Sequence, residues 1–272
     1  IAGTNPLDIE IADLDGDGDL DIVGAFQGYN SKSGITWIEN ISDSPINGAN
    51  WDTKLIYSGD ENKFPTLIND MDFRYISVDD IDNDGDLDIV SGSNTHNSSA
   101  TELGHINLYE NDGASDPTWT KTTIDSYIPG YFVELADIDR DGDLDIVSAS
   151  KNPYGTTTYI DWYENDGAAT WTPAFTAADI NISANVARDL HIADMDRDGD
   201  LDIVSASSGD NTIAWYENDG AANPSWTASD ISYTALGPRG IFLADIDSDG
   251  DLDIISASSG DNTIAWYEND GA

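Results

Sequence analysis

The sequence predicts an all-β protein built from repeated four-stranded blades, the architecture of a β-propeller. An Asp-rich segment of nine residues occurs five times, beginning at residues 13, 80, 137, 194 and 245. An aromatic segment ending in Glu-Asn follows each copy, and after the first four copies comes a further segment that begins with Trp. No stretch shows convincing helical periodicity, whereas several alternate in the manner of β-strands.

The fifth repeat shows how the segments of one blade are expected to fold. Residues 240–244, before the Asp-rich loop, form strand A, and residues 252–258 form strand B. Residues 263–268 form strand C, because their side chains alternate with a period of two, and Asn-Asp-Gly after them is a tight-turn sequence. The segment that begins with Trp is strand D, and only this last repeat lacks it. Four strands in 40–60 residues favour a propeller over a β-solenoid, while an ordinary β-sandwich does not explain five copies.

We expect one domain over residues 1–272, with repeats at 1–57, 58–125, 126–182, 183–232 and 233–272. The repeats could close as a five-bladed ring with one three-stranded blade, or belong to a ring of six to eight blades. Residues 205–221 and 256–272 are identical, which suggests an array that copies itself. Without strand D, the edge at Trp266 is open, and self-association through this blade edge is one expectation.

The composition excludes several classes of partner. The chain has 53 acidic and 10 basic residues, a formal net charge of -43, so nucleic acid and anionic membranes are repelled. No apolar run approaches the roughly 20 residues that a membrane span requires, so membrane insertion is not expected. There is no Cys, and disulfides therefore do not hold the fold. The sequence starts at Ile1 and is interpreted as a mature or excised segment of a secreted or cell-surface protein.

The Asp-rich loop has the composition of a calcium site. Ca²⁺ takes six to eight oxygen ligands, and a short loop with carboxylates at alternate positions supplies several of them. Positions 1, 3 and 5 are expected to bind through carboxylates, Gly at position 6 permits a sharp turn, position 7 offers its backbone carbonyl and position 9 closes the site. An EF-hand is excluded, because position 12 is Gly or Ser instead of Glu and the flanking segments are strands.

Five such loops predict about five Ca²⁺ ions per chain, in a structural role that pins the connection between strands A and B. The predicted ligands are Asp13, Asp15, Asp17, Asp19 and Asp21; Asp80, Asp82, Asp84, Asp86 and Asp88; Asp137, Asp139, Asp141, Asp143 and Asp145; Asp194, Asp196, Asp198, Asp200 and Asp202; and Asp245, Asp247, Asp249, Asp251 and Asp253. Only a cation makes this density of carboxylates tolerable.

These motifs resemble the FG-GAP/VCBS repeat. The resemblance rests on the Asp-x-Asp-x-Asp-Gly-Asp-Leu-Asp loop between strands and covers nearly the whole chain, and Trp-Tyr-Glu-Asn-Asp-Gly resembles the bacterial versions. The literal Phe-Gly and Gly-Ala-Pro sequences of the family name are absent. The resemblance implies a calcium-binding β-propeller, as in the heads of integrin α-subunits and in some lectins, and a binding or adhesion role outside the cell.

Recognition is expected at the end of the blades opposite the calcium loops, where the connections vary between repeats. Arg74, Arg188 and Arg239 each lie six residues before a calcium loop, and Tyr131 fills the same place in the third repeat. One hypothesis is that these residues bind an acidic ligand, a glycan or a side chain of an extracellular protein. The alternative is that each Arg offsets local acidity.

Two other functions stay open. The three His residues, His96, His105 and His191, are the candidates for acid–base catalysis, as in polysaccharide lyases of similar architecture. No Cys nucleophile, Gly-x-Ser-x-Gly elbow or phosphate-binding Gly loop is present, so an enzyme is not expected. A structural element of an extracellular assembly is the third hypothesis.

Overall fold

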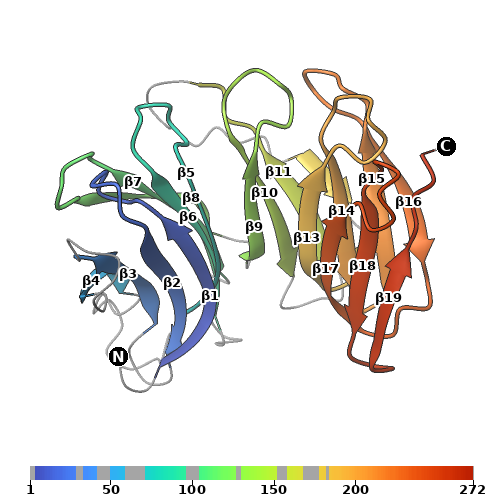
Figure 1. Ribbon diagram of the computed structural model, residues 1–272, viewed down its shortest axis with the longest axis horizontal. Helices are drawn as coiled ribbons and strands as arrows, with labels where there is room; N and C mark the ends of the chain where they lie inside the picture. The colour runs from blue at the N-terminus through green and yellow to red at the C-terminus, as the bar shows by residue number, and fades with distance from the viewer. Residues whose placement is uncertain are drawn as a thin grey trace. The chain divides into compact units, whose positions relative to one another are not determined.

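The computed structural model describes residues 4–28, 33–41, 50–58, 71–95, 104–126, 130–151, 158–167, 178–181 and 184–271. All regular secondary structure in these ranges is β-strand (Figure 1). None of the described segments is a helix long and apolar enough to span a membrane. The chain divides into two compact units, Ile1–Val133 and Glu134–Ala272. The expectation of a single domain over the whole chain stays a prediction.

Unit 1 contains two four-stranded blades. Blade 1 consists of β1 (Thr4–Ala12), β2 (Asp21–Gly28), β3 (Gly34–Asn40) and β4 (Trp51–Ser58), and blade 2 of β5 (Met71–Asp79), β6 (Asp88–Thr95), β7 (Gly104–Asn111) and β8 (Trp119–Asp125). Consecutive strands of each blade pair antiparallel. A single pair, Gln27 opposite Asp72, joins β2 to β5, so the two blades share one sheet.

Two further four-stranded blades and one three-stranded blade form unit 2, whose boundary with unit 1 lies within the first strand, β9. Blade 3 consists of β9 (Gly130–Ala136), β10 (Asp145–Lys151), β11 (Thr158–Tyr163) and β12 (Ala178–Asn181), blade 4 of β13 (Ala187–Ala193), β14 (Asp202–Ser207), β15 (Thr212–Asn218) and β16 (Trp226–Ser232), and blade 5 of β17 (Pro238–Ala244), β18 (Asp253–Ser258) and β19 (Thr263–Tyr267). Neighbouring strands again follow the order of the chain. The predicted blade of strands A to D is therefore confirmed, and blade 5 ends at strand C.

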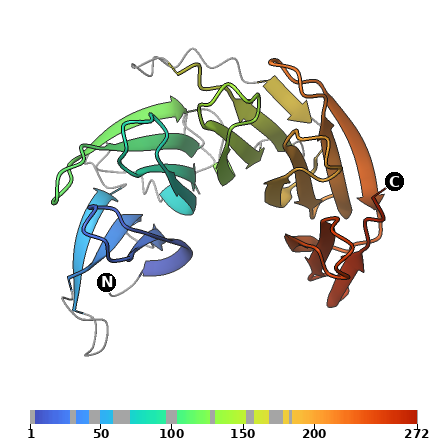
Figure 2. The same cartoon turned by 45° about the horizontal axis from the view of Figure 1, so that its top comes forward.

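The fourth strand begins at the predicted Trp in blades 1, 2 and 4, at Trp51, Trp119 and Trp226. The corresponding Trp171 of blade 3 lies outside the described residues. Up-and-down pairing places the A–B loop and the C–D turn at one end of each blade and the B–C turn and D–A connection at the other. We call the first the loop end and the second the bulge end. In unit 2, the loop ends of blades 3 to 5 lie at the top of Figure 1, and Figure 2 brings this end forward.

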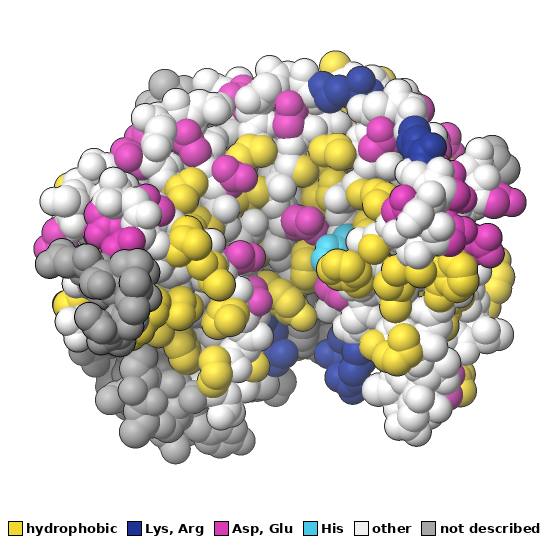
Figure 3. All heavy atoms as spheres, viewed as in Figure 1, with side chains coloured by type: hydrophobic (Ala, Val, Ile, Leu, Met, Phe, Trp, Pro, Cys, Tyr) yellow, Lys and Arg dark blue, Asp and Glu magenta, His cyan; other side chains and the backbone are white. Residues whose placement is uncertain are grey.

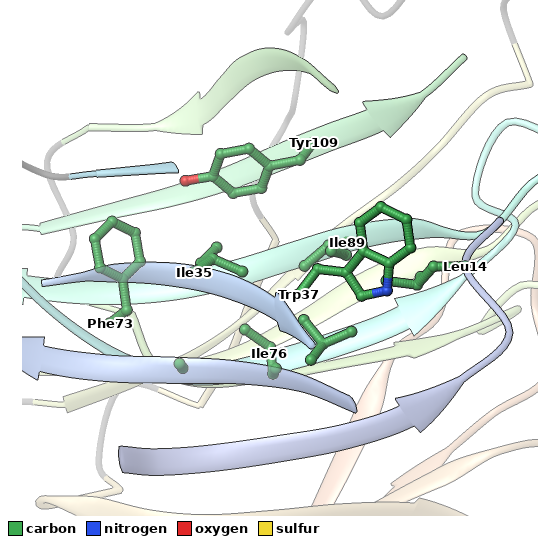
Figure 4. Packing of buried hydrophobic residues seen from close by; sticks show 9 residues of the cluster. Leu14, Ile35, Trp37, Phe73, Ile76, Ile89 and Tyr109 are labelled. Carbon is green, nitrogen blue, oxygen red and sulfur yellow. The ribbon is translucent and has the colours of Figure 1, made fainter. Parts of the chain in front are cut away.

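The core lies between the faces of neighbouring blades. In unit 1, Leu14, Val23 and Trp37 of blade 1 pack with Ile76 and Tyr109 of blade 2 in one cluster (Figure 4). In unit 2, the corresponding cluster joins Met195, Val204 and Ile213 of blade 4 to Ile241 and Ile254 of blade 5. Strand B is buried on both faces in blades 3 and 4, where its Ser residues are buried as well as its apolar ones. Of the Trp residues repeated in strand C, Trp37 and Trp162 are buried and Trp215 packs partly buried against the cluster of unit 2, whereas Trp266 is 48% exposed.

Strand A carries a β-bulge in four blades. The register shifts between Pro6 and Asp8, Phe73 and Tyr75, Ala187 and Asp189, and Pro238 and Gly240. The residue skipped by the pairing is Leu7 in blade 1 and an Arg in blades 2, 4 and 5. A bulge bends the strand and re-aims the side chain of the extra residue. In these four blades, the residue six positions before the calcium loop therefore has no partner in the regular pairing of strands A and B.

Candidate metal centres

The backbone of each Asp-rich loop turns sharply at two positions. Position 4 has a positive φ in every copy, 59° to 69°, although it is Gly, Asn, Arg, Arg and Ser in turn. Gly at position 6 has φ between 94° and 102°, a conformation that other residues rarely adopt. A Cβ at Gly18, Gly85 or Gly142 would meet no atom within 4 Å, so backbone conformation, not lack of space, selects Gly here.

The carboxylate at position 1 binds the loop on one side and is open on the other. One of its oxygens accepts the N–H of the position 6 Gly in all five loops, at 2.9–3.2 Å. The other oxygen, Oδ1, is buried without a hydrogen-bond partner in Asp13, Asp137 and Asp194. In Asp80 this oxygen accepts the N–H of Asp84 at 3.0 Å. A buried carboxylate oxygen without a donor is costly unless a cation satisfies it.

The carboxylates at positions 3 and 5 lie around the same point. Each accepts the backbone N–H two residues later with Oδ1, as Asp196 does from Asp198 at 3.1 Å and Asp198 from Asp200 at 2.9 Å. These bonds curl the loop so that its carboxylates converge. In every loop, oxygens of three Asp residues lie within 4.8 Å of one another: positions 1, 3 and 5 in blades 1, 3 and 5, and positions 1, 3 and 9 in blades 2 and 4.

The carboxylate at position 9 ties the loop to the C–D turn. It is buried in all five copies. Its Oδ2 accepts the N–H of position 2 at 3.0–3.3 Å. Its Oδ1 accepts the N–H of the Asn in Glu-Asn at 2.7–2.9 Å. Position 9 thus holds the strand ends together, whether or not it also faces an ion. The sequence predicted this Asp only as a ligand that closes the metal site.

The position 7 side chain points away from this cluster in blades 2 to 5, toward the glycine of the Asn-Asp-Gly turn. That glycine has a positive φ of 64° to 66°, and a Cβ there would overlap the position 7 carboxylate. In unit 2 an Arg from the preceding loop adds a second contact. Arg197 lies 2.8 Å from Asp251, and Arg140 pairs with Asp200. This geometry agrees with position 7 offering an ion its backbone carbonyl.

Crowding and burial change how these carboxylates hold protons. Burial raises the pKa of Asp88 to about 7, with the nearby charges of Asp82 and Asp84 adding to the rise. Burial likewise raises the pKa of Asp145 to about 7 and, with the charges of Asp17 and Asp21, that of Asp15 to about 6. A carboxylate with a raised pKa is costly to ionise in the folded protein, and a bound divalent cation offsets this cost by stabilising the charged form.

The donor set fits Ca²⁺. It consists only of oxygen atoms, several of them carboxylate oxygens within reach of one centre, as a hard cation prefers. The unpartnered oxygens at position 1 face such a centre. Of the predicted ligands, the fold brings together positions 1, 3 and 5 in blades 1, 3 and 5 and positions 1, 3 and 9 in blades 2 and 4, whereas the position 7 carboxylate of blades 2 to 5 lies against a turn glycine.

In blades 1 to 3, one acidic residue near the loop was not predicted from the sequence. The Glu that precedes the Asn at the end of strand C lies near the position 3 Asp of its own blade. Burial is the main cause that raises the pKa of Glu110, and the nearby charge of Asp82 raises it further. Burial and the charge of Asp139 raise the pKa of Glu164 in the same way. In blade 1, Glu39 hydrogen-bonds Asp15 and is paired with Lys54 at 3.0 Å. The repeated Trp-Tyr-Glu-Asn sequence was the available signal for this residue.

The predicted acidic-ligand residues differ in their surroundings. Arg74 lies 3.3 Å from the buried Asp72, which also accepts a hydrogen bond from Gln27 at 2.7 Å. Arg188 and Arg239 instead donate from Nε to Ser208 and Ser259 of their own B–C turns, at 3.1 and 2.9 Å. Figure 3 shows basic side chains in the lower central part of the view and again near the top.

Two of the other candidate residues are not covered by the structural description. His96 and the side chain of Tyr131 lie outside the described residues. His105 is buried in unit 1, with its N–H bonded to Ser93. His191 is in unit 2, where its Nε2 lies 3.0 Å from the carbonyl oxygen of Ile241. The described His residues therefore make contacts within the scaffold.

Comparison with known protein families agrees with this geometry. The profile of the FG-GAP-like repeat matches three times, over residues 80–148, 137–205 and 194–256. Each match starts at position 1 of one Asp-rich loop and extends into strand B of the next repeat, and together they cover more than half of the chain. No curated protein matches the sequence. By its blades, its loops and these matches, the chain belongs to the FG-GAP-like repeat family.

Proposed function

We propose that this protein is a calcium-stabilised binding module that works outside the cell and is not an enzyme. The observation that carries the proposal is the buried, unpartnered oxygen of the position 1 carboxylate in Asp13, Asp137 and Asp194. Ca²⁺ would satisfy it and neutralise the other carboxylates of each loop. About five ions per chain would then act as part of the scaffold.

Extracellular surroundings supply the millimolar calcium that sites of this kind use. Calcium sites of extracellular modules have dissociation constants of about 10⁻⁴–10⁻³ M, so they are filled outside cells. The formal net charge of -43 is tolerable where both salt and calcium are present.

The bulge ends are the proposed binding surface. Loop ends are nearly identical in all repeats and are engaged in internal contacts, whereas bulge ends differ between blades. Of the basic residues there, Arg239 is exposed and its Nε is fixed by Ser259, which leaves its terminal nitrogens directed away from that contact. In blade 4, Arg188 donates to Ser208, which is equivalent to Ser259. We propose an acidic ligand, a uronate or sulfated glycan or an acidic segment of an extracellular protein, bound by Arg188 and Arg239 of unit 2.

A binding experiment on matched variants tests this surface. The calcium-loaded protein and the double variant Arg188→Ala/Arg239→Ala are compared on uronate and sulfated glycans and on acidic peptides. Arg197→Ala is the control, because it removes an Arg at the loop end of the same unit. We expect at least tenfold weaker binding for the double variant and unchanged binding for the control. Equal binding by all three proteins would contradict an Arg-lined site.

A further inference from the structure

The Asn at the end of strand C contacts the Asp-rich loops of two blades. In blade 4, Asn218 donates its backbone N–H to Asp202 at 2.9 Å and its side-chain amide to the carbonyl of Leu201 at 3.1 Å, so it holds positions 9 and 8 of its own loop. The same amide donates to the carbonyl of Ile138, position 2 of the loop in blade 3, at 3.2 Å. Asn218 is 1% exposed, so these hydrogen bonds are shielded from water. One side chain thus connects two neighbouring loops.

The same bridge recurs within each unit. In unit 1, Asn111 of blade 2 donates to the carbonyl of Leu14 in blade 1, at 2.9 Å. In unit 2, Asn269 of blade 5 donates to the carbonyl of Met195 in blade 4, also at 2.9 Å. Position 2 donates its N–H to position 9 of the same loop, so hydrogen bonds run without a gap through the loops of blades 3, 4 and 5. We call Asn111, Asn218 and Asn269 the bridging Asn residues.

In unit 2, an Arg adds a second link between neighbouring loops. Position 4 is Arg140 in blade 3 and Arg197 in blade 4, and both have a positive φ, 61° and 63°, in a region that favours Gly and Asn. Arg140 pairs with Asp200, position 7 of the next loop. Arg197 lies 2.8 Å from Asp251, and a Cβ on Gly250 would lie 2.7 Å from its Nη2. Each Arg therefore combines an unfavourable backbone conformation with a contact to the loop of the next blade.

Unit 1 has a bridging Asn without the Arg. Position 4 of blade 1 is Gly16, so it has no side chain that could reach Asp86, position 7 of blade 2. Its φ of 69° is close to that of the two Arg residues. A Cβ at Gly16 would meet no atom within 4 Å, so the loop has room for a longer side chain. The two units therefore contain a weaker and a stronger form of the same link.

We propose that the calcium loops of unit 2 are energetically coupled, so that an ion in one loop strengthens ion binding by the loops beside it. This inference rests on the proposed calcium sites. An ion held by positions 1 to 9 fixes the carbonyl of position 2 and the side chain of position 4. These two groups hold the bridging Asn and the position 7 Asp of the next loop, which is then closer to its ion-bound shape before its own ion arrives. The effect is reciprocal, because coupling between two binding sites must be equal in both directions.

Direct electrostatic interaction between the loops predicts the opposite sign. An empty loop keeps the full negative charge of its carboxylates, which attracts calcium to the loops beside it, whereas a filled loop has lost part of that attraction. Charge alone therefore makes neighbouring ions weaken each other's binding. Coupling through the bridging Asn and the Arg makes neighbouring ions strengthen each other's binding, so the sign of the effect separates the two explanations.

Emptying the middle loop of unit 2 tests the proposal. Asp194→Asn is compared with Asp13→Asn, its counterpart in unit 1, by equilibrium dialysis with radioactive calcium from the micromolar to the millimolar range. Circular dichroism of the metal-free proteins verifies that both are folded. For Asp194→Asn, we expect two of the four remaining ions to require about fivefold more calcium, and for Asp13→Asn, which removes a loop without the Arg link, we expect a shift of less than about twofold for one ion. Both variants should still bind four ions at saturation.

The Arg link is tested by a double-mutant cycle. Arg140→Gln/Arg197→Gln removes no proposed ligand, so this variant should still bind five ions. Adding Asp194→Asn in this background should shift the remaining ions by less than about twofold. Arg239→Gln, at the bulge end of the same unit, is the matched control, and in its background Asp194→Asn should cause the full shift.

Gly16→Arg supplies the missing link of unit 1, so in this background the shift caused by Asp13→Asn should grow toward that of unit 2. Five ions in the original chain, with no shift or tighter binding in Asp194→Asn, would overturn the coupling and leave the calcium sites standing. An equal shift with and without the two Arg residues would overturn the link assigned to them. Absence of bound calcium in the original chain would instead contradict the proposed calcium sites themselves.

Discussion

The two ends of a blade follow different rules. At the loop end, five repeats place the same residue types at positions 1, 3, 5, 6, 7 and 9, and each makes the same backbone contact. At the bulge end, the skipped residue of strand A is Leu7, Arg74, Arg188 or Arg239. Arg74 pairs with Asp72, whereas Arg188 and Arg239 each donate to a Ser of their own B–C turn. The repeated residues of the loop end thus belong to the scaffold, whereas the bulge end is where the repeats can differ without loss of the fold.

We expect the largest loss of stability when calcium is removed, because the proposed ions then leave the loop ends of all five blades at once. A ligand present at 100 times its dissociation constant stabilises the folded state by about 2.7 kcal/mol per site. Emptying five sites should therefore lower the melting temperature far more than any single substitution. Thermal unfolding followed by circular dichroism, in 2 mM calcium and after exhaustive chelation, checks this. Magnesium at the same concentration is the control for ionic strength, and it should not restore the calcium value.

Two substitutions in one loop separate the ion from the scaffold. Asp202→Ala removes the acceptor for the N–H groups of Met195 and Asn218, at a cost of about 1–3 kcal/mol for each buried donor, with or without calcium. Asp194→Asn should lower the number of bound ions by one without lowering the metal-free melting temperature, because an Asn oxygen can still accept the N–H of Gly199 and the loop loses one repelling charge. Chemical unfolding of both variants, with and without calcium, gives the comparison. Equal effects of the two in metal-free buffer would contradict the division of roles.

At the bulge end, Arg74 and Arg239 should behave differently. Arg74→Ala leaves the buried Asp72 without its ion-pair partner, so we expect a loss of about 1–3 kcal/mol. Arg239→Ala, at an exposed position, should change stability by less than about 0.5 kcal/mol. Urea unfolding at fixed calcium measures both. A second substitution, Asp72→Asn in the Arg74→Ala background, should restore part of the loss, and an unstable Arg239→Ala variant would argue for a structural role of that residue.

The smallest effect concerns pH and belongs to the metal-free protein. Asp88 and Asp145, with pKa values raised by burial to about 7, bind protons in the folded chain that they release on unfolding. Because the folded state then binds more protons than the unfolded state between about pH 4 and 7, its stability rises as the pH falls through this range. Calcium affinity should fall over the same interval, since protons compete for the carboxylates. A metal-free melting temperature that decreases from pH 8 to pH 5.5 would contradict these shifts.

The blades and their strands could be predicted because two signals repeat together. The Asp-rich loops fix where strand A ends and strand B begins, and the alternation around Trp266 gives strand C. The start of strand D followed from Trp51, Trp119 and Trp226. These features are local, so they can be seen in one repeat and verified in the next.

The division of labour within the loop could not be predicted. An Asp at position 9 looks like an Asp at position 1 in the sequence. Only the fold brings Asn218 to Asp202 across 16 residues, and only the fold leaves one oxygen of Asp194 without a donor. The bulge that sets Arg188 and Arg239 outside the ladder depends on pairing with the next strand, which the period-two pattern of a single strand does not show.

The number of calcium ions bound per chain tests the central claim most directly. Equilibrium dialysis with radioactive calcium, on metal-free protein at pH 7.5 and with calcium raised into the millimolar range, measures this number. We predict a value near five, falling to near four in Asp194→Asn. A value near zero, or a melting temperature unaffected by chelation, would contradict the assignment of the Asp-rich loops as structural calcium sites.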